Sequence, residues 1–93
     1  MKKNYVYILT NKPKGVLYIG VTSNLEQRLD QHQLSETKSF TKKYWLKRLV
    51  YIEEFNSITE AITREKQLKR WHRGWKINQI ESVNPGWKDL LED

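Results

Sequence analysis

Three titratable side chains fall on helix faces where apolar residues are expected. Around a helical wheel, Arg28 and His32 lie about 60° and about 20° from Leu25, the apolar mark of their stretch. In a later stretch, Glu65 lies about 20° from Ile58, inside an apolar stripe completed by Ala61, Ile62 and Leu68. Because burying an unpaired charge is costly, these groups either pair with one another or line a cleft that a ligand or ion completes. The structural alternative is an Arg28–Glu65 salt bridge, with His32 partly exposed at the helix end.

Two tyrosines on adjacent strands could complete a site. Side chains alternate between the two faces of a sheet, so Tyr5 and Tyr7 share one face. With a turn centred near Pro13, Tyr7 is expected roughly opposite Tyr18. Tyrosine pairs across strands more often serve packing than chemistry. Their hydroxyls would nevertheless lie beside the arginine, histidine and glutamate if helices and tyrosines share a face of the sheet.

Such a group of side chains suits phosphate chemistry. An arginine can hold a phosphate oxygen bidentately and neutralise charge in the transition state. A single glutamate can anchor one Mg²⁺ that keeps most of its waters, and a tyrosine or histidine can take a proton from a water nucleophile or orient it. The chain has no cysteine, which excludes disulfides, thiolate zinc sites and a cysteine nucleophile. Its two histidines, His32 and His72, lack the spacing of a zinc pair.

The strands that must carry the tyrosines are predicted from aromatic and β-branched residues. These gather at 4–10, 16–21 and 48–55. Residues 11–15 have turn chemistry, with an asparagine, a proline and a closing glycine. The first two strands are therefore expected to form an antiparallel hairpin.

Helices are expected at 23–33, 58–72 and 75–82. The first two begin with a serine followed three residues later by a glutamate, which is capping-box spacing. Gly74 is expected to break or kink the second helix, and the acidic tail at 87–93 is expected to add a last helical turn. The order strand, strand, helix, strand, helix, helix favours an α+β fold, a small three-stranded antiparallel sheet flanked by helices.

Length and composition favour one small basic domain. The chain has 93 residues, with 17 basic and 11 acidic side chains for a net charge of +6. No apolar run approaches the ~20 residues of a membrane span, and the N-terminus lacks the pattern of a signal peptide. We therefore expect a soluble, cytoplasmic protein with no membrane partner.

The basic charge is concentrated in two blocks, residues 38–50 and residues 64–76, each with a local charge of +5. Both contain aromatic residues, among them Trp71 and Trp75. Cations attract phosphate and aromatic faces stack on bases, so the mixture suits nucleic acid. The alternative is a solvated basic face whose tryptophans belong to the core. The candidate nucleic-acid ligands are Lys42, Lys43, Arg64, Lys69, Arg70, Arg73 and Lys76.

The motifs at 5–7 (Tyr-Val-Tyr) and 18–20 (Tyr-Ile-Gly) resemble the two triplets of the GIY-YIG nuclease domain. That domain is found in the incision subunit of bacterial nucleotide excision repair, in some homing endonucleases and in small stand-alone proteins. The downstream Arg28 and late Glu65 follow in the family's order, and the resemblance spans 4–76. The text at 84–90 looks like the stand-alone branch, which makes 77–93 a C-terminal helical extension of a single domain over the whole chain.

The resemblance implies single-metal hydrolysis of DNA phosphodiester bonds. By position, Tyr7 would activate the nucleophile with Tyr18 as its partner. Arg28 would bind the scissile phosphate, and His32 would assist proton transfer or hold a phosphate. Glu65 would be the sole protein ligand of Mg²⁺ or Mn²⁺.

Three further positions bear on the resemblance. Asn84 is a candidate match to a late polar residue near the family's site. Gly20 either ends a strand or leaves room for backbone close to a phosphate. The first triplet has Tyr5 where the family has glycine, so a bulky side chain must fit where a small one is usual.

Three functions from different classes remain open from the sequence. The first is a metal-dependent DNA endonuclease, which in so small a chain relies on its own basic blocks or on a protein partner for targeting. The second is a non-catalytic nucleic-acid-binding domain that keeps the nuclease fold. The third is an interaction module in which the Arg28–Glu65 pair is structural.

Overall fold

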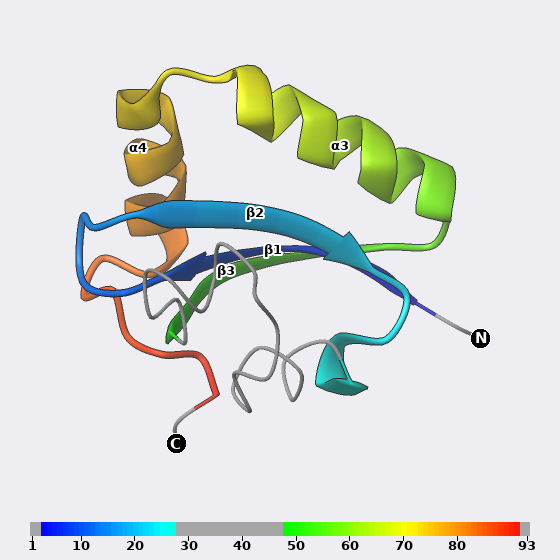
Figure 1. Ribbon diagram of the computed structural model, residues 1–93, viewed down its shortest axis with the longest axis horizontal. Coiled ribbons are helices and arrows are strands. Elements are labelled where there is room, and N and C mark those ends of the chain that lie inside the picture. Colours follow the sequence, from blue (N-terminus) through cyan, green and yellow to red (C-terminus); the bar gives the residue numbers. More distant parts are fainter. Residues whose placement is uncertain (1–2, 28–47, 92–93) are drawn as a thin grey trace.

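The protein is an α+β fold built on one three-stranded antiparallel sheet, as the sequence predicts. The computed structural model describes residues 3–27 and 48–91. The sheet order is β2-β1-β3, so β1 is central and β2 is an open edge among the described residues. Two helices follow the third strand (Figure 1). The elements are β1 Asn4–Thr10, β2 Leu17–Thr22, β3 Arg48–Phe55, α3 Ile58–Arg70 and α4 Arg73–Val83.

Strand β1 is buried on both faces of the sheet. Its aromatic and β-branched residues alternate, so that Val6 and Ile8 point to one face and Tyr7 and Leu9 to the other. All four are at most 1% exposed. The central strand therefore carries packing on both sides, and the residues of β2 and β3 extend each face outward.

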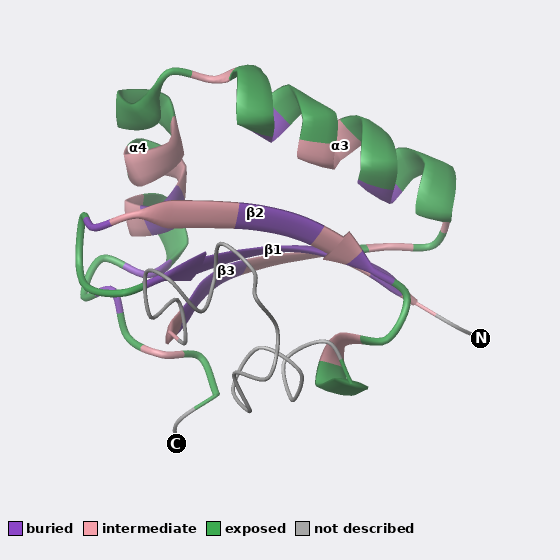
Figure 2. Cartoon of the chain, in the orientation of Figure 1, coloured by how far each residue is buried: buried purple, intermediate pink, exposed green. Residues whose placement is uncertain are grey.

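Helices α3 and α4 cover one face of the sheet, and a helical turn at 25–27 lies on the other side (Figure 1). Figure 2 shows buried residues along the strands and on the inner side of the helices. The helix-covered core consists of Val6, Ile8, Ile19, Val50, Tyr51, Ala61, Leu68, Ile80 and Trp87. The opposite core is smaller, with Tyr7, Leu9 and Leu49 at its centre and Val16, Tyr18 and Leu25 around them.

The turn between β1 and β2 is closed by its own side chains. The Asn11 Oδ1 accepts a hydrogen bond from the Val16 N–H at 3.0 Å. A Cβ on Gly15 would lie 2.0 Å from that oxygen, so only glycine fits there. The Arg73 guanidinium donates to the Lys14 carbonyl at 2.6 Å and to the Gly15 carbonyl, which ties the turn to the start of α4.

Helix α3 begins where the sequence predicts. The Ser57 hydroxyl accepts from the Thr59 N–H at 3.1 Å and from the Glu60 N–H at 3.5 Å, which is an N-cap. The helix ends at Arg70 rather than 72, because Trp71 takes an extended conformation. The sequence predicts a break or kink at Gly74, but Gly74 lies inside the first turn of α4.

The predicted start of the first helix needs a similar correction. Helical backbone begins at 25, and the capping side chain is Asn24 rather than Ser23. The Asn24 Oδ1 accepts from the Gln27 N–H at 3.1 Å, and the Asn24 N–H donates to the Thr22 hydroxyl at 3.0 Å. The rest of the helix predicted to 33 lies outside the described residues.

The apolar stripe of α3 is narrower than predicted. Ala61 and Leu68 are fully buried, whereas Ile58 and Ile62 are 43% and 38% exposed. On a helical wheel Ile62 is about 100° from Ala61, so only the Ala61–Leu68 side can face the sheet. Glu65, about 40° from Ala61, lies on the flank of this narrow stripe and is half-buried.

The tail predicted to be helical forms turns instead over 84–91. Helix α4 ends at Val83. Trp87 has a φ of 54° and is buried, and its indole N–H donates to Glu81 at 2.7 Å. The Leu90 N–H donates to the Leu49 carbonyl at 2.7 Å. Among the described residues, the extension predicted at 77–93 is therefore helical only through Val83, and 84–91 are held against the start of β3. No helix in the part of the chain that the structure describes has the length and apolar character of a membrane span.

Replacing Leu68 with alanine tests the helix-covered core. Leu68→Ala should lower the free energy of unfolding by about 2–5 kcal/mol, because Leu68 is fully buried between helix and sheet. Ile62→Ala, on the exposed flank of the same helix, should change it by less than about 0.5 kcal/mol. Urea unfolding of both variants measures the difference, and equal losses would contradict this assignment of the core.

Candidate active site

The two candidate catalytic tyrosines lie diagonally across β1 and β2. The register places Tyr7 opposite Gly20 and Leu9 opposite Tyr18, so the expectation that Tyr7 lies roughly opposite Tyr18 is off by two residues. Both tyrosines point to the face that also carries Leu25. Their ring centroids are 6.3 Å apart with an interplanar angle of 38°. The pair is therefore in contact on one face of the sheet, as the alternation of strand side chains requires.

Gly20 makes room for the Tyr7 phenol. A Cβ on Gly20 would lie 2.4 Å from the Tyr7 hydroxyl oxygen and 2.5 Å from Cζ. The end of the ring thus lies over the Gly20 backbone, in the space that any other side chain would fill. Because β2 is the outer strand, the Tyr7 hydroxyl extends from the central strand toward the open edge of the sheet.

Glu65 reaches the sheet from the other face. Helix α3 packs on the face opposite Tyr7 and Tyr18, so the expectation that helices and tyrosines share one face does not hold for this helix. The Glu65 carboxylate is half-buried, and its Oε2 lies 3.0 Å from Lys69 Nζ. Among the described residues, Glu65 is thus paired with a lysine of its own helix, and Arg28 lies outside those residues.

Helix α3 nevertheless turns Glu65 toward β2. Lys69, one helical turn further along the same flank, lines a pocket of about 300 Å³ with Leu17, Tyr18, Ile19 and Lys76. The helix runs opposite in direction to β2 (Figure 1). Glu65 is therefore about 6 Å further along the helix axis than Lys69 toward the end of β2 where Gly20 lies. The phenol thus lies over β2 on one face, and Glu65 belongs to the flank of α3 whose Lys69 lies beside β2 on the other.

A polar network on the other flank fixes the rotation of α3. The Arg64 guanidinium donates to both Glu53 oxygens on β3, at 2.9 Å and 3.0 Å. Glu53 also accepts from the Tyr51 hydroxyl, which in turn accepts from Gln79 of α4 at 2.9 Å. Neighbouring helix residues are about 100° apart. With Arg64 directed to β3, the next residue, Glu65, must be directed away from β3 and toward β2.

This network shifts the pKa values of its members in the expected directions. Burial, followed by the hydrogen bond to Glu53, raises the pKa of Tyr51. Hydrogen bonds to Glu53 raise the pKa of Arg64. The Arg64 guanidinium also lies 5.1 Å from the centre of the Trp71 ring. Arg64, predicted as a nucleic-acid ligand, is thus occupied by an acid and an aromatic ring within the protein.

Glu65 fits the needs of a hydrated divalent cation. Mg²⁺ binds proteins through one or two carboxylates plus substrate phosphates and keeps several waters. Among the described residues no three histidine, cysteine or acidic side chains lie close enough to form a metal cluster. A cation at Glu65 would therefore use one carboxylate, water and a phosphate, and it would compete with Lys69 for that carboxylate.

The other predicted phosphate ligands differ in how free they are. Lys69 and Arg70 are exposed on α3. Lys76 lines the pocket beside β2, with its Nζ 3.4 Å from the Lys69 carbonyl. Arg73 is bound to the carbonyls of the β1–β2 turn. Outside the described residues lie Arg28, His32, Lys42 and Lys43.

Asn84 is engaged within the protein. Its side-chain N–H groups donate to the Val50 carbonyl at 3.1 Å and to the Lys88 carbonyl at 2.8 Å. Its Oδ1 accepts from the Lys88 N–H at 3.0 Å. The residue is buried and ties the turn after α4 to β3, so its amide serves the fold.

Sequence reasoning missed Tyr51 and Glu53. The signal was present, because residues two apart in a strand share a face. Tyr51 is in the helix-covered core, so Glu53 was a carboxylate directed at the helices. An inward-facing charge can thus be read from a strand as well as from a helix.

The chain belongs to the GIY-YIG catalytic domain family. The family's model matches residues 3–78, which include both tyrosine triplets and Glu65. This is a family of nucleases, and the match agrees with the arrangement of tyrosines, glycine and glutamate around β2.

The chain is also similar to several small whole proteins. It is 40% identical over 81 residues to a UPF0213 protein of Staphylococcus haemolyticus, covering 87% of this chain and 98% of that protein. It is 38% identical over 86 residues to a UPF0213 protein of Syntrophus aciditrophicus, covering 91% and 97%. The solution NMR structure of a UPF0213 protein from Bacillus halodurans matches with a TM-score of 0.59 and 26% identity, covering 94% and 92% of the two chains.

Adding one methyl group at Gly20 tests the packing of the Tyr7 phenol. Gly20→Ala should lower the free energy of unfolding by about 1–3 kcal/mol, because the new Cβ meets the buried ring at less than 3 Å. Gly74→Ala is the matched control, since nothing lies within 4 Å of a Cβ there. It should stabilise the protein by about 0.4–1 kcal/mol. Chemical denaturation measures both, and an unchanged Gly20→Ala would refute this packing.

Removing the Tyr51 hydroxyl tests the network through its pH dependence. A raised pKa means that the folded state prefers the neutral phenol, so the stabilisation is fully present below pH 10 and is lost as pH rises through the folded-state pKa. Tyr51→Phe should be about 1 kcal/mol less stable than wild type below pH 10, and the gap should narrow above it. Parallel stability curves across this range would show that the phenol pKa is not raised.

Proposed function

We propose that this protein is a divalent-metal-dependent DNA endonuclease whose active site lies at the open edge of β2. The observation that carries the proposal is the approach of two groups to that edge. The Tyr7 phenol lies over Gly20 on one face, and on the other face Glu65 pairs with Lys69, which lines a pocket against β2. Membership of a nuclease family supports the same chemistry.

Tyr7 is proposed to act on the water nucleophile. Its phenol is held in one position by burial and by the Gly20 backbone beneath it, which fixes where its oxygen can act. A positioned phenol can accept a proton from water or orient it for attack. Tyr18, in ring contact with Tyr7, supports this position and lines the pocket that also holds Lys69 and Lys76.

Arg28 and His32 are proposed on the sequence resemblance. Arg28 would bind the scissile phosphate with its planar guanidinium and neutralise the charge that develops during attack. His32 would transfer a proton or hold a phosphate oxygen. Both follow β2 along the chain, which is the strand that carries Tyr18 and Gly20.

Glu65 is proposed to hold Mg²⁺ or Mn²⁺. When bound, such an ion polarises the phosphate and stabilises the leaving oxygen. Lys69, whose Nζ lies 3.0 Å from the Glu65 carboxylate, would be displaced by the ion. Lys69 and Lys76 at the pocket beside β2 would attract the phosphates of the same DNA strand.

Removing the Glu65 charge is the main test of this function. Labelled single-stranded, duplex, flap and branched DNAs would be incubated with Mg²⁺, Mn²⁺ or EDTA. Wild type should cleave at least one of them only with metal. Glu65→Gln should reduce the rate by about 100-fold or more while leaving DNA affinity nearly unchanged, because it deletes the metal ligand but no cation.

Glu60→Gln is the matched control for this experiment. Glu60 is exposed in the first turn of the same helix, so its variant should cleave like wild type. If neither wild type nor control cleaves any DNA while both bind it, the chain is a non-catalytic nucleic-acid-binding domain. If Glu65→Gln cleaves as fast as Glu60→Gln, Glu65 does not hold the metal.

Removing one hydroxyl tests the role of Tyr7. Tyr7→Phe keeps the ring over Gly20 and should reduce the cleavage rate by about 10²–10⁴-fold, the usual contribution of a general base. Tyr5→Phe, on the same face of the same strand, should cleave like wild type. Single-turnover rates separate the two, and equal rates for both variants would rule out the proposed role of the Tyr7 phenol.

A further inference from the structure

An aromatic cluster is exposed where α3 meets α4. Trp75, in the first turn of α4, is 56% exposed, although so large an apolar side chain is usually well buried. The Trp71 ring lies 6.0 Å from it at 83°, and the His72 ring lies 5.3 Å from it at 90°. Two perpendicular rings thus support Trp75 while more than half of it stays open to a ligand.

Cations border the same cluster. A pocket of about 400 Å³ beside Trp71 is lined by Thr63, Lys66, Gln67, Arg70 and Trp71 itself. This volume is within the range of small-ligand sites, and the lining contains two cations and no acid. Arg64 already covers the Trp71 ring at 5.1 Å, and that arginine is paired with Glu53.

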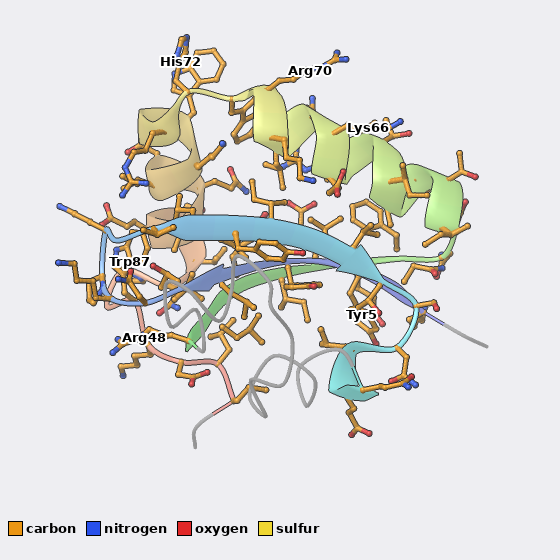
Figure 3. The ribbon with its side chains drawn as sticks, in the orientation of Figure 1. Tyr5, Arg48, Lys66, Arg70, His72 and Trp87 are labelled. Atoms are coloured by element: carbon orange, nitrogen blue, oxygen red, sulfur yellow. The ribbon has the colours of Figure 1, made fainter. Side chains whose placement is uncertain are left out.

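This corner is separate from the β2 edge. Lys66 and Arg70 are about 160° and about 200° from buried Leu68 around the helix, so they lie on its outer side. Figure 3 shows Lys66, Arg70 and His72 directed away from the sheet. Glu65 and Lys69 lie on the flank that faces β2. Helix α3 therefore presents two basic surfaces, one at the candidate active site and one outside it.

We propose that the corner formed by Lys66, Arg70, Trp71, His72 and Trp75 binds an unpaired base of single-stranded or branched DNA by stacking. The inference rests on the proposed function and names its substrate class. Base–aromatic stacking contributes about 1–3 kcal/mol per base and tolerates any sequence. Bases in a duplex are covered by their neighbours, so an exposed tryptophan distinguishes unpaired DNA from paired DNA.

The charges at the corner favour DNA over an apolar protein segment. Each base in a single strand lies between two phosphates, and here cations lie beside the aromatic platform with no acid in the lining. Neutralised phosphates make binding depend on salt, whereas stacking does not. The two contributions can therefore be measured apart.

Replacing Trp75 tests the stacking. Binding of a labelled oligothymidylate would be followed by anisotropy in EDTA, so that no cleavage occurs. Trp75→Leu should weaken single-strand binding by about tenfold with an unchanged salt slope, and Trp75→Tyr should retain most of the affinity. Arg70→Gln should reduce the salt slope by about one unit or less. Affinity for a duplex of the same length should change less than threefold in Trp75→Leu.

Two results would overturn the inference. The first is that Trp75→Leu binds single-stranded DNA as tightly as wild type does, and the second is that it loses the same affinity for single strand and duplex. Because Trp75 is exposed, its variants should have a free energy of unfolding within about 0.5 kcal/mol of the wild-type value, and urea unfolding checks this. The assay needs no metal, so it also separates the two proposals. If no DNA is cleaved but binding depends on Trp75, only the nuclease proposal is wrong. If DNA is cleaved but binding does not depend on Trp75, only the stacking proposal is wrong.

Discussion

The ion pair between Arg64 and Glu53 determines how helix α3 sits on the sheet. Its hydrogen bonds are charge-assisted and run from the guanidinium to both carboxylate oxygens. Each of the two side chains is only about a fifth exposed. Tyr51 and Gln79 extend it to α4, so one network joins β3 and both helices. The core residues Ala61 and Leu68 supply the burial between this helix and the sheet. The ion pair selects one rotation, and every other surface of α3 takes its place from that rotation.

The rotation of α3 places Lys69 beside β2, which is an edge strand among the described residues. An unpaired edge strand exposes backbone groups, and proteins commonly protect such edges with lysines. Here Lys69 and Lys76 lie beside Leu17–Ile19. The positive charge of these two lysines, which protects the edge strand from pairing with another chain, also suits a phosphate. Gly20, further along the strand, lets the Tyr7 phenol reach that edge.

The sequence predicts the strands well because their aromatic and β-branched residues are dense and bounded by turn residues. Each predicted strand agrees within one residue, and the Ser57 cap is confirmed by its hydrogen bonds. The helical wheel was less informative. It showed that Glu65 lies near an apolar stripe, but an angle does not say which face of the sheet a helix covers. Ile58 and Ile62 are exposed because the buried stripe is only one residue wide on each turn.

The site could be predicted in part for a related reason. Residue types and order are enough to propose Tyr7, Tyr18 and Glu65 as site residues, but the register that sets Tyr7 over Gly20 depends on the turn, which pairs Thr10 with Leu17. The break between the helices was assigned to Gly74 because glycine is a weak helix former. The chain instead turns at Trp71, whose ring packs against the core and under Arg64. Tertiary packing decided the boundary over local propensity.

The order of charges in α3 encodes its rotation. Successive residues are about 100° apart, so Arg64, Glu65 and Lys66 face β3, the β2 edge and solvent in turn. If the helix slipped by one residue, Glu65 would face Glu53, and two carboxylates would meet where a salt bridge now forms. Repulsion between like charges at such a partly buried position opposes that slip. Arg64 and the candidate metal ligand Glu65 are therefore neighbours in the helix whose positions depend on each other. Arg64 stabilises the placement of Glu65 without contacting the β2 edge.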